Sequence, residues 1–410
     1  MIGRRFIALY TLANIGAYVA FIPLLQILLP LRATAIDPTH GALLLSRVAL
    51  WGAVAASVGN IVFGALSDRT RSRRGHRVPW LLGGLGATLL AYAVIWWARD
   101  PAGLLLGLVG FQLAFNALFA PLGAVLADDV PDRQKGMVSA LLGLGNPLGS
   151  IIGAVCAGAL AVSLGARFLL IAAIVAALIL PFAWRLARQA SPPRPRAKTP
   201  LPDRFRIRPL RHLNFTRAIG GRFLVMTAFS LMQSYLLLYL QHLARHAGFF
   251  RMTPEAAFAH LAVIATTANV FFALLCGRWS DRAGNRSLFV FAGGAILACG
   301  IVAIAHAPDW TALQFCMALY GSGAGIYYAV DMALIVELLP SLQTAGQDLG
   351  IVNLSNTVPQ IVAPGVALAI LRINPDDFQD LLMLGALVAA LGAAAVLGIA
   401  SPARKPGPLP

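Results

Sequence analysis

Few side chains in this sequence could do chemistry, and the most informative are single charged groups inside long apolar runs. Asp331 is one of them, and Asp348, Arg47 and His260 lie nearer the ends of their runs. Ionisable residues in such runs are functional candidates by default. Asp331 lies deepest, about 8 Å from the end of its run at 1.5 Å per residue. It could therefore carry a proton, or it could pair permanently with an arginine such as Arg222 and stay ionised.

Neutral polar side chains recur on single faces of the predicted helices. Residues three, four or seven positions apart share one face of a helix. This spacing groups Asn14 with Tyr18, Gln112 with Asn116, Tyr320 with Tyr327 and Asp331, and Asn353 with Asn356 and Gln360. Amides and aromatic rings suit a hydroxyl-rich solute such as a sugar, so we expect these residues to bind substrate. The alternative is hydrogen bonding between helices, which is common for Asn and Gln in membrane bundles.

Catalytic and metal-binding patterns do not occur in the sequence. The seven histidines are scattered, with no His-Glu-x-x-His and no Gly-x-Ser-x-Gly motif. The four cysteines, Cys156, Cys276, Cys299 and Cys316, lie in apolar runs without metal-ligand spacing, so we interpret them as core residues. No Gly-x4-Gly-Lys-Ser/Thr loop for ATP occurs either. We expect no catalytic residues, no metal and no cofactor.

The composition places all of these residues in a membrane. The chain has 410 residues, of which 59% are apolar and 12% charged, against roughly 45–50% and 25% in soluble proteins. A membrane-spanning helix needs about 20 mostly apolar residues. Twelve such runs are predicted, at 6–30, 43–66, 79–98, 102–127, 137–163, 166–187, 215–241, 256–279, 288–306, 310–336, 347–371 and 378–400.

The charge of the chain predicts its orientation. The formal net charge is +16, and the basic residues gather in alternate loops, as the positive-inside rule requires of cytoplasmic loops. Both termini are then cytoplasmic, in a multi-pass protein of the cell membrane. The basic charge is a topology signal, so we expect no nucleic-acid partner.

The chain repeats itself after a Pro- and Arg-rich linker at 188–214. Ser67-Asp68-Arg69 follows the second run and Ser280-Asp281-Arg282 the eighth. Val130-Pro131 ends the fourth run and Leu339-Pro340 the tenth, while Asn146-Pro147 and Asn356 with Pro359 interrupt the fifth and eleventh. Three landmarks at nearly one offset indicate two related bundles. The predicted domains are 1–187, the linker 188–214, and 215–410 with a short cytoplasmic tail.

The loops after the second and eighth runs carry a recognisable motif. Gly64-Ala-Leu-Ser-Asp68-Arg69-Thr-Arg71-Ser-Arg73-Arg74 resembles the signature Gly-x-x-x-Asp-Arg-x-Gly-x-Arg-Arg of the major facilitator superfamily, with Arg71 in place of the second glycine. A second copy begins at Gly277. The first loop with Pro79-Trp80, and the segment Ala345-Gly-Gln-Asp348, look like the glycoside–pentoside–hexuronide porters and the sucrose–proton symporters. Cation-coupled members of that branch carry acids within the second and fourth helices, which this chain lacks, and this argues against sodium coupling.

These loops are expected to form a latch at the inner face. Asp68 can meet the positive end of the eleventh helix and Asp281 that of the fifth, while the loop arginines can pair with acids that end the fourth helix. The latch residues would be Gly64, Asp68, Arg69, Arg73, Arg74, Asp128, Asp129, Gly277, Asp281 and Arg282. The alternative is that these arginines only set the topology.

The resemblance implies an all-α membrane protein with twelve transmembrane helices in two pseudo-symmetric six-helix bundles. It implies a secondary transporter, not an enzyme, which moves a small molecule by alternating access. We expect a monomer that imports a sugar or glycoside with a proton and has no partners beyond its substrate and the lipid bilayer. A drug or metabolite efflux pump of the same fold is the alternative, and a polytopic membrane enzyme a distant third.

Overall fold

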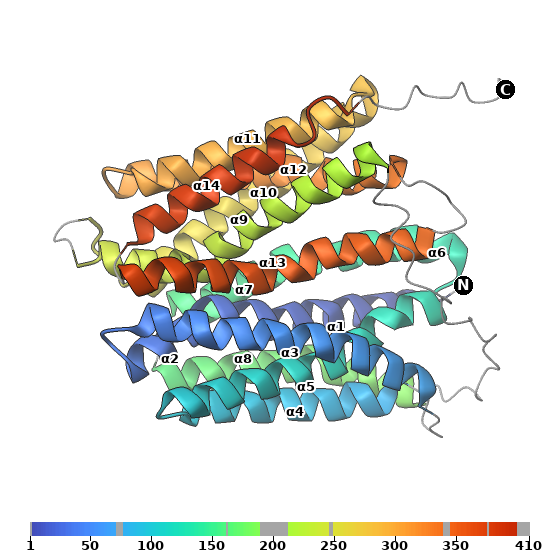
Figure 1. Ribbon diagram of the computed structural model, residues 1–410. Helices are drawn as coiled ribbons and strands as arrows, with labels where there is room; N and C mark the ends of the chain where they lie inside the picture. Colours follow the sequence, from blue (N-terminus) through green and yellow to red (C-terminus); the bar gives the residue numbers. More distant parts are fainter. Residues whose placement is uncertain are drawn as a thin grey trace. The chain divides into compact units, whose positions relative to one another are not determined.

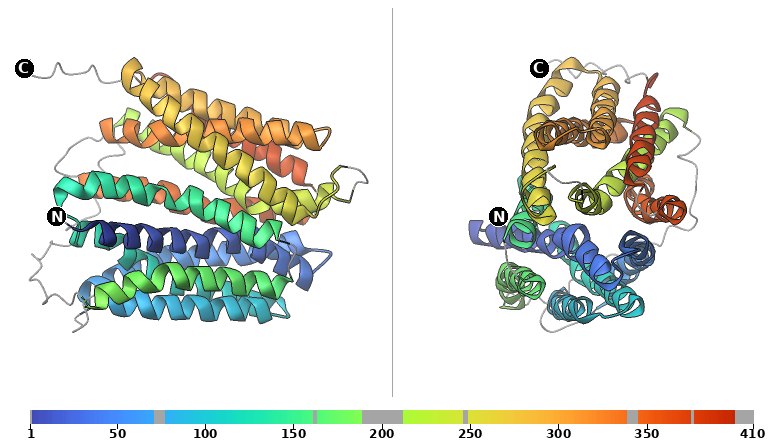
Figure 2. Two further views of the ribbon diagram at one scale, coloured as in Figure 1. Left: turned by 180° about the vertical axis from the view of Figure 1, so that it is seen from behind. Right: turned by 90° about the vertical axis from the view of Figure 1, so that its left-hand side faces the viewer.

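The computed structural model describes residues 2–70, 77–160, 163–188, 212–245, 249–338, 345–374 and 377–399. Every regular element in these ranges is a helix, and within each unit the helices run nearly along a common direction (Figures 1 and 2). Contacts divide the chain into two compact units. The first holds α1 to α8, together with Leu236–His242 and Met252–Ala262; the second holds α9 up to Tyr235, α10 from Val263, and α11 to α14.

The helices of the first half follow the first six predicted apolar runs. They are α1 (Arg4–Pro23), the π-helix η1 (Leu24–Leu28), α2 (Leu29–Ile36), α3 (Gly41–Arg69), α4 (Val78–Trp97), α5 (Pro101–Asp128), α6 (Asp132–Gly143), α7 (Gly145–Gly153), the π-helix η2 (Ala154–Ala159) and α8 (Leu164–Arg188). The first run comprises α1, η1 and α2, and the fifth comprises α6, α7 and η2. Prolines in the first turn start α4 and α5, where a missing N–H costs nothing.

The second half contains one helix for each of the remaining six runs. They are α9 (Leu213–Leu243), α10 (Pro254–Ala283), α11 (Arg286–Ala305), α12 (Trp310–Glu337), α13 (Ala345–Ile373) and α14 (Phe378–Ala394). Gly284, with φ of 69°, ends α10, because glycine adopts this left-handed conformation without strain. The Asn285 side chain then accepts a hydrogen bond from the Leu288 N–H and starts α11.

Length and apolar composition suit these helices to a bilayer. Within the described residues, nine helical segments are long and apolar enough to span a membrane, and Thr357–Ile373 and Phe378–Ala394 are shorter apolar helices. The predicted linker 188–214 lies almost wholly outside the described residues, as does the tail after Ile399. The predicted domain boundary therefore stays a prediction.

Proline breaks the fifth run in one half only. α6 ends at Gly143 and α7 begins at Gly145, just before Pro147, which has no N–H to donate to the Gly143 carbonyl. The eleventh run carries Pro359 and Pro364 but remains the single helix α13. The predicted interruption is thus confirmed as a helix break in the fifth run, whereas the eleventh continues through its prolines.

Glycines let the helices of each unit pack closely, and they do so at repeated positions. A Cβ on Gly84 of α4 would lie 2.6 Å from the Leu118 nitrogen of α5. A Cβ on Gly293 of α11 would lie 2.6 Å from the Tyr327 nitrogen of α12. Both members of the second pair follow those of the first by 209 residues. The internal repeat read from the sequence therefore extends to helix packing.

Candidate functional site

A buried ion pair joins two helices of the second unit. The guanidinium of Arg222 on α9 contacts the carboxylate of Asp331 on α12. Arg222 is 5% exposed and Asp331 2% exposed, and no other described acid is buried. Asp331 lies six residues before the end of α12, or about 9 Å along the helix axis. The pairing foreseen as the alternative for Asp331 is therefore present.

Aromatic side chains of the same two helices surround this pair. Tyr327 and Tyr328 on α12 lie close enough to Arg222 to interact electrostatically. Phe229 of α9 packs against Tyr328 edge to face, with ring centroids 5.2 Å apart, and lies parallel to Tyr320 at 6.2 Å. The Tyr328 hydroxyl donates to the Met226 sulfur at 3.6 Å. The buried Tyr320 hydroxyl has no hydrogen-bond partner among the described residues. It is therefore available to form a hydrogen bond with a ligand.

The first unit has a neutral contact at the matching place. Leu122 of α5 lies 209 residues before Asp331, and its carbonyl accepts a hydrogen bond from the Tyr10 hydroxyl of α1 at 2.9 Å. Tyr10 and Leu122 are both fully buried. At this offset Asp331 corresponds to Leu122 and Arg222 to Ala13, so the first unit has no charged residue at either place.

Amide side chains link α3 and α5 in the first unit. Asn60 donates to the Asn116 side-chain oxygen at 3.2 Å, and Asn116 donates to the Gln112 carbonyl at 2.8 Å. The buried side-chain oxygen of Gln112 has no partner among the described residues. Sequence reasoning missed Asn60. It could have been found as the single amide side chain in the second apolar run. A Cβ on Gly59 would lie 3.3 Å from the Asn116 Cβ, so the helices approach closely here.

Asn14 and Tyr18 lie elsewhere in the same unit, between α1 and α7. A Cβ on Gly145 would lie 2.3 Å from the Asn14 side-chain oxygen, which is buried and has no described partner. The Tyr18 ring meets Phe119 edge to face at 5.8 Å. The first unit thus holds two polar groups, one between α3 and α5 and one between α1 and α7.

Arg77 holds together the ends of α3, α4 and α5. Its guanidinium bonds Asp128 at 2.7 and 3.1 Å and donates to the Ser67 hydroxyl at 2.6 Å. In the second unit, Arg286 lies 2.9 Å from a Glu337 oxygen and donates to the Ala333 carbonyl at 3.1 Å. Both partners are again displaced by 209 residues. Sequence reasoning missed Arg77 and Arg286, although Arg77 directly precedes α4 and Arg286 is the first residue of α11.

The Arg77–Asp128 pair yields a prediction for stability. Arg77 is 4% exposed, and Asp128→Asn should remove its ion pair with the carboxylate that lies 2.7 Å away. We expect a loss of about 1.5–3 kcal/mol in the free energy of unfolding, measured by thermal unfolding in detergent. Asp129→Asn, at the exposed neighbouring position, is the control and should change little. Equal effects in the two variants would show that the ion pair contributes nothing.

Several predicted residues cannot be placed through their side chains. The backbones of five of them belong to α3, α10 and α13, but their side chains lie outside the described part: Asp68, Arg69, Asp281, Asn353 and Asn356. Three more residues lie outside the described part altogether, namely Arg71, Arg73 and Arg74. Gly64 lies in α3, and a Cβ on Gly277 of α10 would meet the Ala329 methyl at 3.8 Å. Asp129, Arg282 and Gln360 are exposed. The latch and the binding role of α13 therefore stay predictions.

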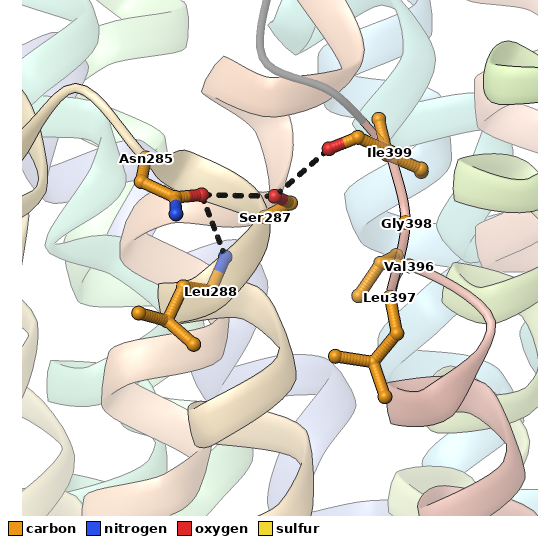
Figure 3. A pocket seen from close by; sticks show the side chains of 7 residues that line it. All are labelled: Asn285, Ser287, Leu288, Val396, Leu397, Gly398 and Ile399. Carbon is orange, nitrogen blue, oxygen red and sulfur yellow. Dashed lines mark hydrogen bonds between the residues drawn. The ribbon is translucent and has the colours of Figure 1, made fainter.

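A pocket of about 420 Å³ lies between the start of α11 and the residues that follow α14. Figure 3 shows that its polar groups bond to one another. The Ser287 hydroxyl lies 3.0 Å from the Asn285 side-chain oxygen and 3.1 Å from the Ile399 carbonyl. Asn285 also caps α11. These contacts join the start of α11 to the segment that follows α14. None of the predicted binding residues lines the pocket.

Comparison with known proteins identifies the family of this chain. The family model described as Major Facilitator Superfamily matches residues 7–364 and, in a second match, 252–410. A curated relative, an uncharacterized symporter named sll1374 from Synechocystis, is 34% identical over 86 residues, or 19% of this chain. The match covers about a sixth, 16%, of that relative's length.

Solved transporter structures share the fold over nearly the whole chain. The nucleoside transporter NupG, solved as a point mutant, superposes with a TM-score of 0.71 at 14% identity, covering 95% of this chain and 99% of its own. The POT family transporter PepTSo gives 0.71 at 12% identity, with 97% of each chain covered. A bacterial homolog of the lysosomal transporter Spinster gives 0.65 at 15%, covering 96% and 95%. At these identities the likeness confirms the predicted fold and no more.

Proposed function

The chain belongs to the major facilitator superfamily, and we propose that it moves a hydroxyl-rich solute, such as a sugar or glycoside, together with a proton. As a member of this family it is a multi-pass membrane protein and a secondary transporter of a small molecule, not an enzyme. In transporters of this fold the two bundles alternately expose a site near the middle of the membrane. Proton coupling and the sugar-like substrate are our proposals.

The single observation that supports proton coupling is the burial of Asp331. It is the only buried acid in the described part of the chain, and charged groups inside membrane helices are costly to keep unless they serve a function. Its carboxylate contacts the guanidinium of Arg222 in this conformation. Proton uptake by Asp331 would break the pair, so the two protonation states favour different arrangements of α9 and α12.

The neutral amides of the first unit support a hydroxylated solute. The side-chain oxygens of Asn14 and Gln112 are buried and have no described partner, and an unpaired acceptor gains from a hydroxyl donor. The Synechocystis relative is named a symporter, which agrees with coupled transport, and NupG is named a nucleoside transporter. Efflux of a drug or metabolite remains the second candidate, favoured by the stacked rings of Phe111, Phe115 and Phe119.

We also propose a monomer with both termini in the cytoplasm. The helix ends that carry Arg77, Arg286 and their acidic partners would then face the cytoplasm, as the positive-inside rule requires. Tagging either terminus in sealed vesicles and testing its access to protease would check this orientation.

The decisive experiment separates exchange from accumulation in Asp331→Asn. In proteoliposomes, wild-type protein should accumulate substrate when a pH gradient is imposed. If Asp331 carries the proton, the variant should still exchange labelled for unlabelled substrate but should lose pH-driven accumulation. The double variant Arg222→Gln/Asp331→Asn, which leaves no unpaired charge, repeats the test if the single variant is unstable. Normal accumulation in both variants would exclude Asp331 as the coupling residue.

A further inference from the structure

A group of arginines at one end of the first unit leads to an inference about the lipid that surrounds the protein. We propose that the start of α1 and the end of α8 together form a binding site for a phospholipid with an anionic headgroup. The proposal concerns the membrane and not the solute, so it does not depend on the proposed substrate or on proton coupling.

The first step brings the two helix ends together. Phe6 of α1 and Phe182 of α8 meet edge to face, with ring centroids 5.5 Å apart. Further along α1, a Cβ on Gly16 would lie 2.8 Å from the Leu178 Cβ of α8. Residue numbers therefore rise along α1 while they fall along α8, so the two helices are antiparallel. The first residues of α1 and the last residues of α8 lie at the same end of the unit.

The second step concerns the charges at this end. Arg4 and Arg5 begin α1, while Arg185 and Arg188 lie in the last turn of α8; these residues form the arginine cluster. The Nε atom of Arg185 is buried and has no hydrogen-bond partner among the described residues. The ion pairs in the described part of the chain join other residues. Because like charges repel each other, an anion bound among these arginines would stabilise this end of the unit.

The third step concerns the apolar surface next to the cluster. Trp184 is 58% exposed, and the guanidinium of Arg188 lies over its ring, 3.6 Å from the centroid. Tryptophan is enriched at the level of the lipid headgroups, because its ring is apolar and its N–H is polar. Leu180, one turn before Trp184, is also exposed, and Ala177 and Ala173 continue the exposed face. This face offers apolar surface to an acyl chain that extends from the headgroup level along α8.

The chemistry of the cluster indicates the kind of headgroup. Phosphate oxygens accept paired hydrogen bonds from the guanidinium of arginine, and basic residues beside a membrane helix attract anionic lipids. A zwitterionic headgroup would bring a cation along with its phosphate into a site that is already positive. A soluble anion would contact the arginines but would leave the exposed apolar face of α8 unused. The expected ligand is therefore an anionic phospholipid such as phosphatidylglycerol.

The opposite end of α8 offers a matched control. A Cβ on Gly165, near the start of α8, would lie 2.8 Å from the indole ring of Trp96, so the end of α4 is located there. Arg99 follows α4, is exposed, and is followed directly by Asp100. Gly165 lies about 30 Å along α8 from Arg185. Arg99 is thus an exposed arginine of the same unit that has an acid beside it and does not belong to the cluster.

Quenching of tryptophan fluorescence by brominated lipid tests the site, because bromine quenches only rings that the lipid contacts. A variant that keeps Trp184 and has phenylalanine in place of the other tryptophans is reconstituted in mixed bilayers of phosphatidylglycerol and phosphatidylcholine, with bromine on one lipid at a time. We expect phosphatidylglycerol to bind next to Trp184 about fivefold or more tightly than phosphatidylcholine. If this variant is unstable, the difference in quenching between wild type and Trp184→Phe gives the same comparison.

The double variant Arg185→Gln/Arg188→Gln tests the arginines. It removes half of the charge of the cluster, so the preference for phosphatidylglycerol should fall to nearly one, whereas Arg99→Gln should keep the wild-type preference. As a second measurement, phosphatidylglycerol added in detergent should raise the unfolding temperature of the wild-type protein more than that of the double variant. Glycerol phosphate, which has the anionic group without acyl chains, should not raise it at the same concentration.

Three results would overturn the proposal. The first is equal quenching of Trp184 by the two lipids. The second is an unchanged preference in Arg185→Gln/Arg188→Gln, or an equal loss in Arg99→Gln. The third is stabilisation by glycerol phosphate as large as that by phosphatidylglycerol, which would indicate a site for a soluble anion and not for a lipid. None of these measurements requires transport, so a failure here would leave the proposed function untouched.

Discussion

Arg222→Met should lower the free energy of unfolding by about 3–5 kcal/mol, which is the usual cost of removing one partner of a buried ion pair. The loss arises because Asp331, 2% exposed, is left with a charge that neither water nor a counter-ion stabilises. Thermal unfolding of the purified transporter in detergent, at one pH and one protein concentration, would measure it. Arg217→Met, at the exposed position on α9, should stay near wild type.

Removal of both charges should restore most of this stability. In Arg222→Met/Asp331→Leu no buried charge remains, and apolar replacement of a buried pair is often neutral or stabilising. A double-mutant cycle with the two single variants would give the coupling between the side chains. Additive single effects would contradict a direct interaction. A stable double variant without pH-driven accumulation would show that the pair is retained for transport.

Gly84→Ala should produce the second large effect, because the added Cβ would lie 2.6 Å from the Leu118 nitrogen of α5. Backbone atoms cannot move aside as a flexible side chain can, so α4 and α5 must separate. Overpacking of this kind typically costs 1–3 kcal/mol, which is more than the gain of up to about 1 kcal/mol from replacing glycine in a helix. The same unfolding measurement would show the net loss.

Gly83→Ala is the matched control for that variant. Gly83 is the preceding residue of α4, and a Cβ there would meet nothing within 4 Å. It should leave stability unchanged or raise it slightly. Gly293→Ala, the repeat equivalent of Gly84, should be as damaging as Gly84→Ala, because its Cβ would lie 2.6 Å from the Tyr327 nitrogen. Similar stability of Gly83→Ala and Gly84→Ala would refute the proposed close contact of α4 and α5.

The two pairs at the helix ends clarify how the repeat is used. Arg77–Asp128 and Arg286–Glu337 occupy equivalent places and join equivalent helices. The pair Arg222–Asp331 has no charged equivalent, because the residues 209 positions earlier are Ala13 and Leu122. Ion pairs that occur in both units are expected to have the same structural role in each. The Arg222–Asp331 pair occurs in the second unit only, which fits a role in transport that this unit alone performs.

The sequence by itself determined the fold class, since each apolar run long enough to cross a bilayer must satisfy its backbone hydrogen bonds internally and therefore forms a helix. It also determined the repeat, because landmarks such as Ser67 and Ser280 recur in order along the chain. The depth of Asp331 within its run followed from counting residues along a regular helix. These properties are local and periodic, so no tertiary contact was needed to find them.

The tertiary structure decided which polar groups meet. Gln112 and Asn116 were correctly expected on one face of their helix, but only packing showed that Asn60 of α3 is the partner of Asn116 there. Packing also showed that Asn14 and Tyr18 meet Gly145 of α7. Arg77 looked like one of many loop arginines until its bonds to Asp128 and Ser67 were seen. Asp331 was compatible with a free carboxylate or a paired one, and the structure pairs it with Arg222. Pairing between helices depends on their rotation and on their separation, which glycines such as Gly59 and Gly84 set, and neither quantity is encoded in the periodicity of a single helix.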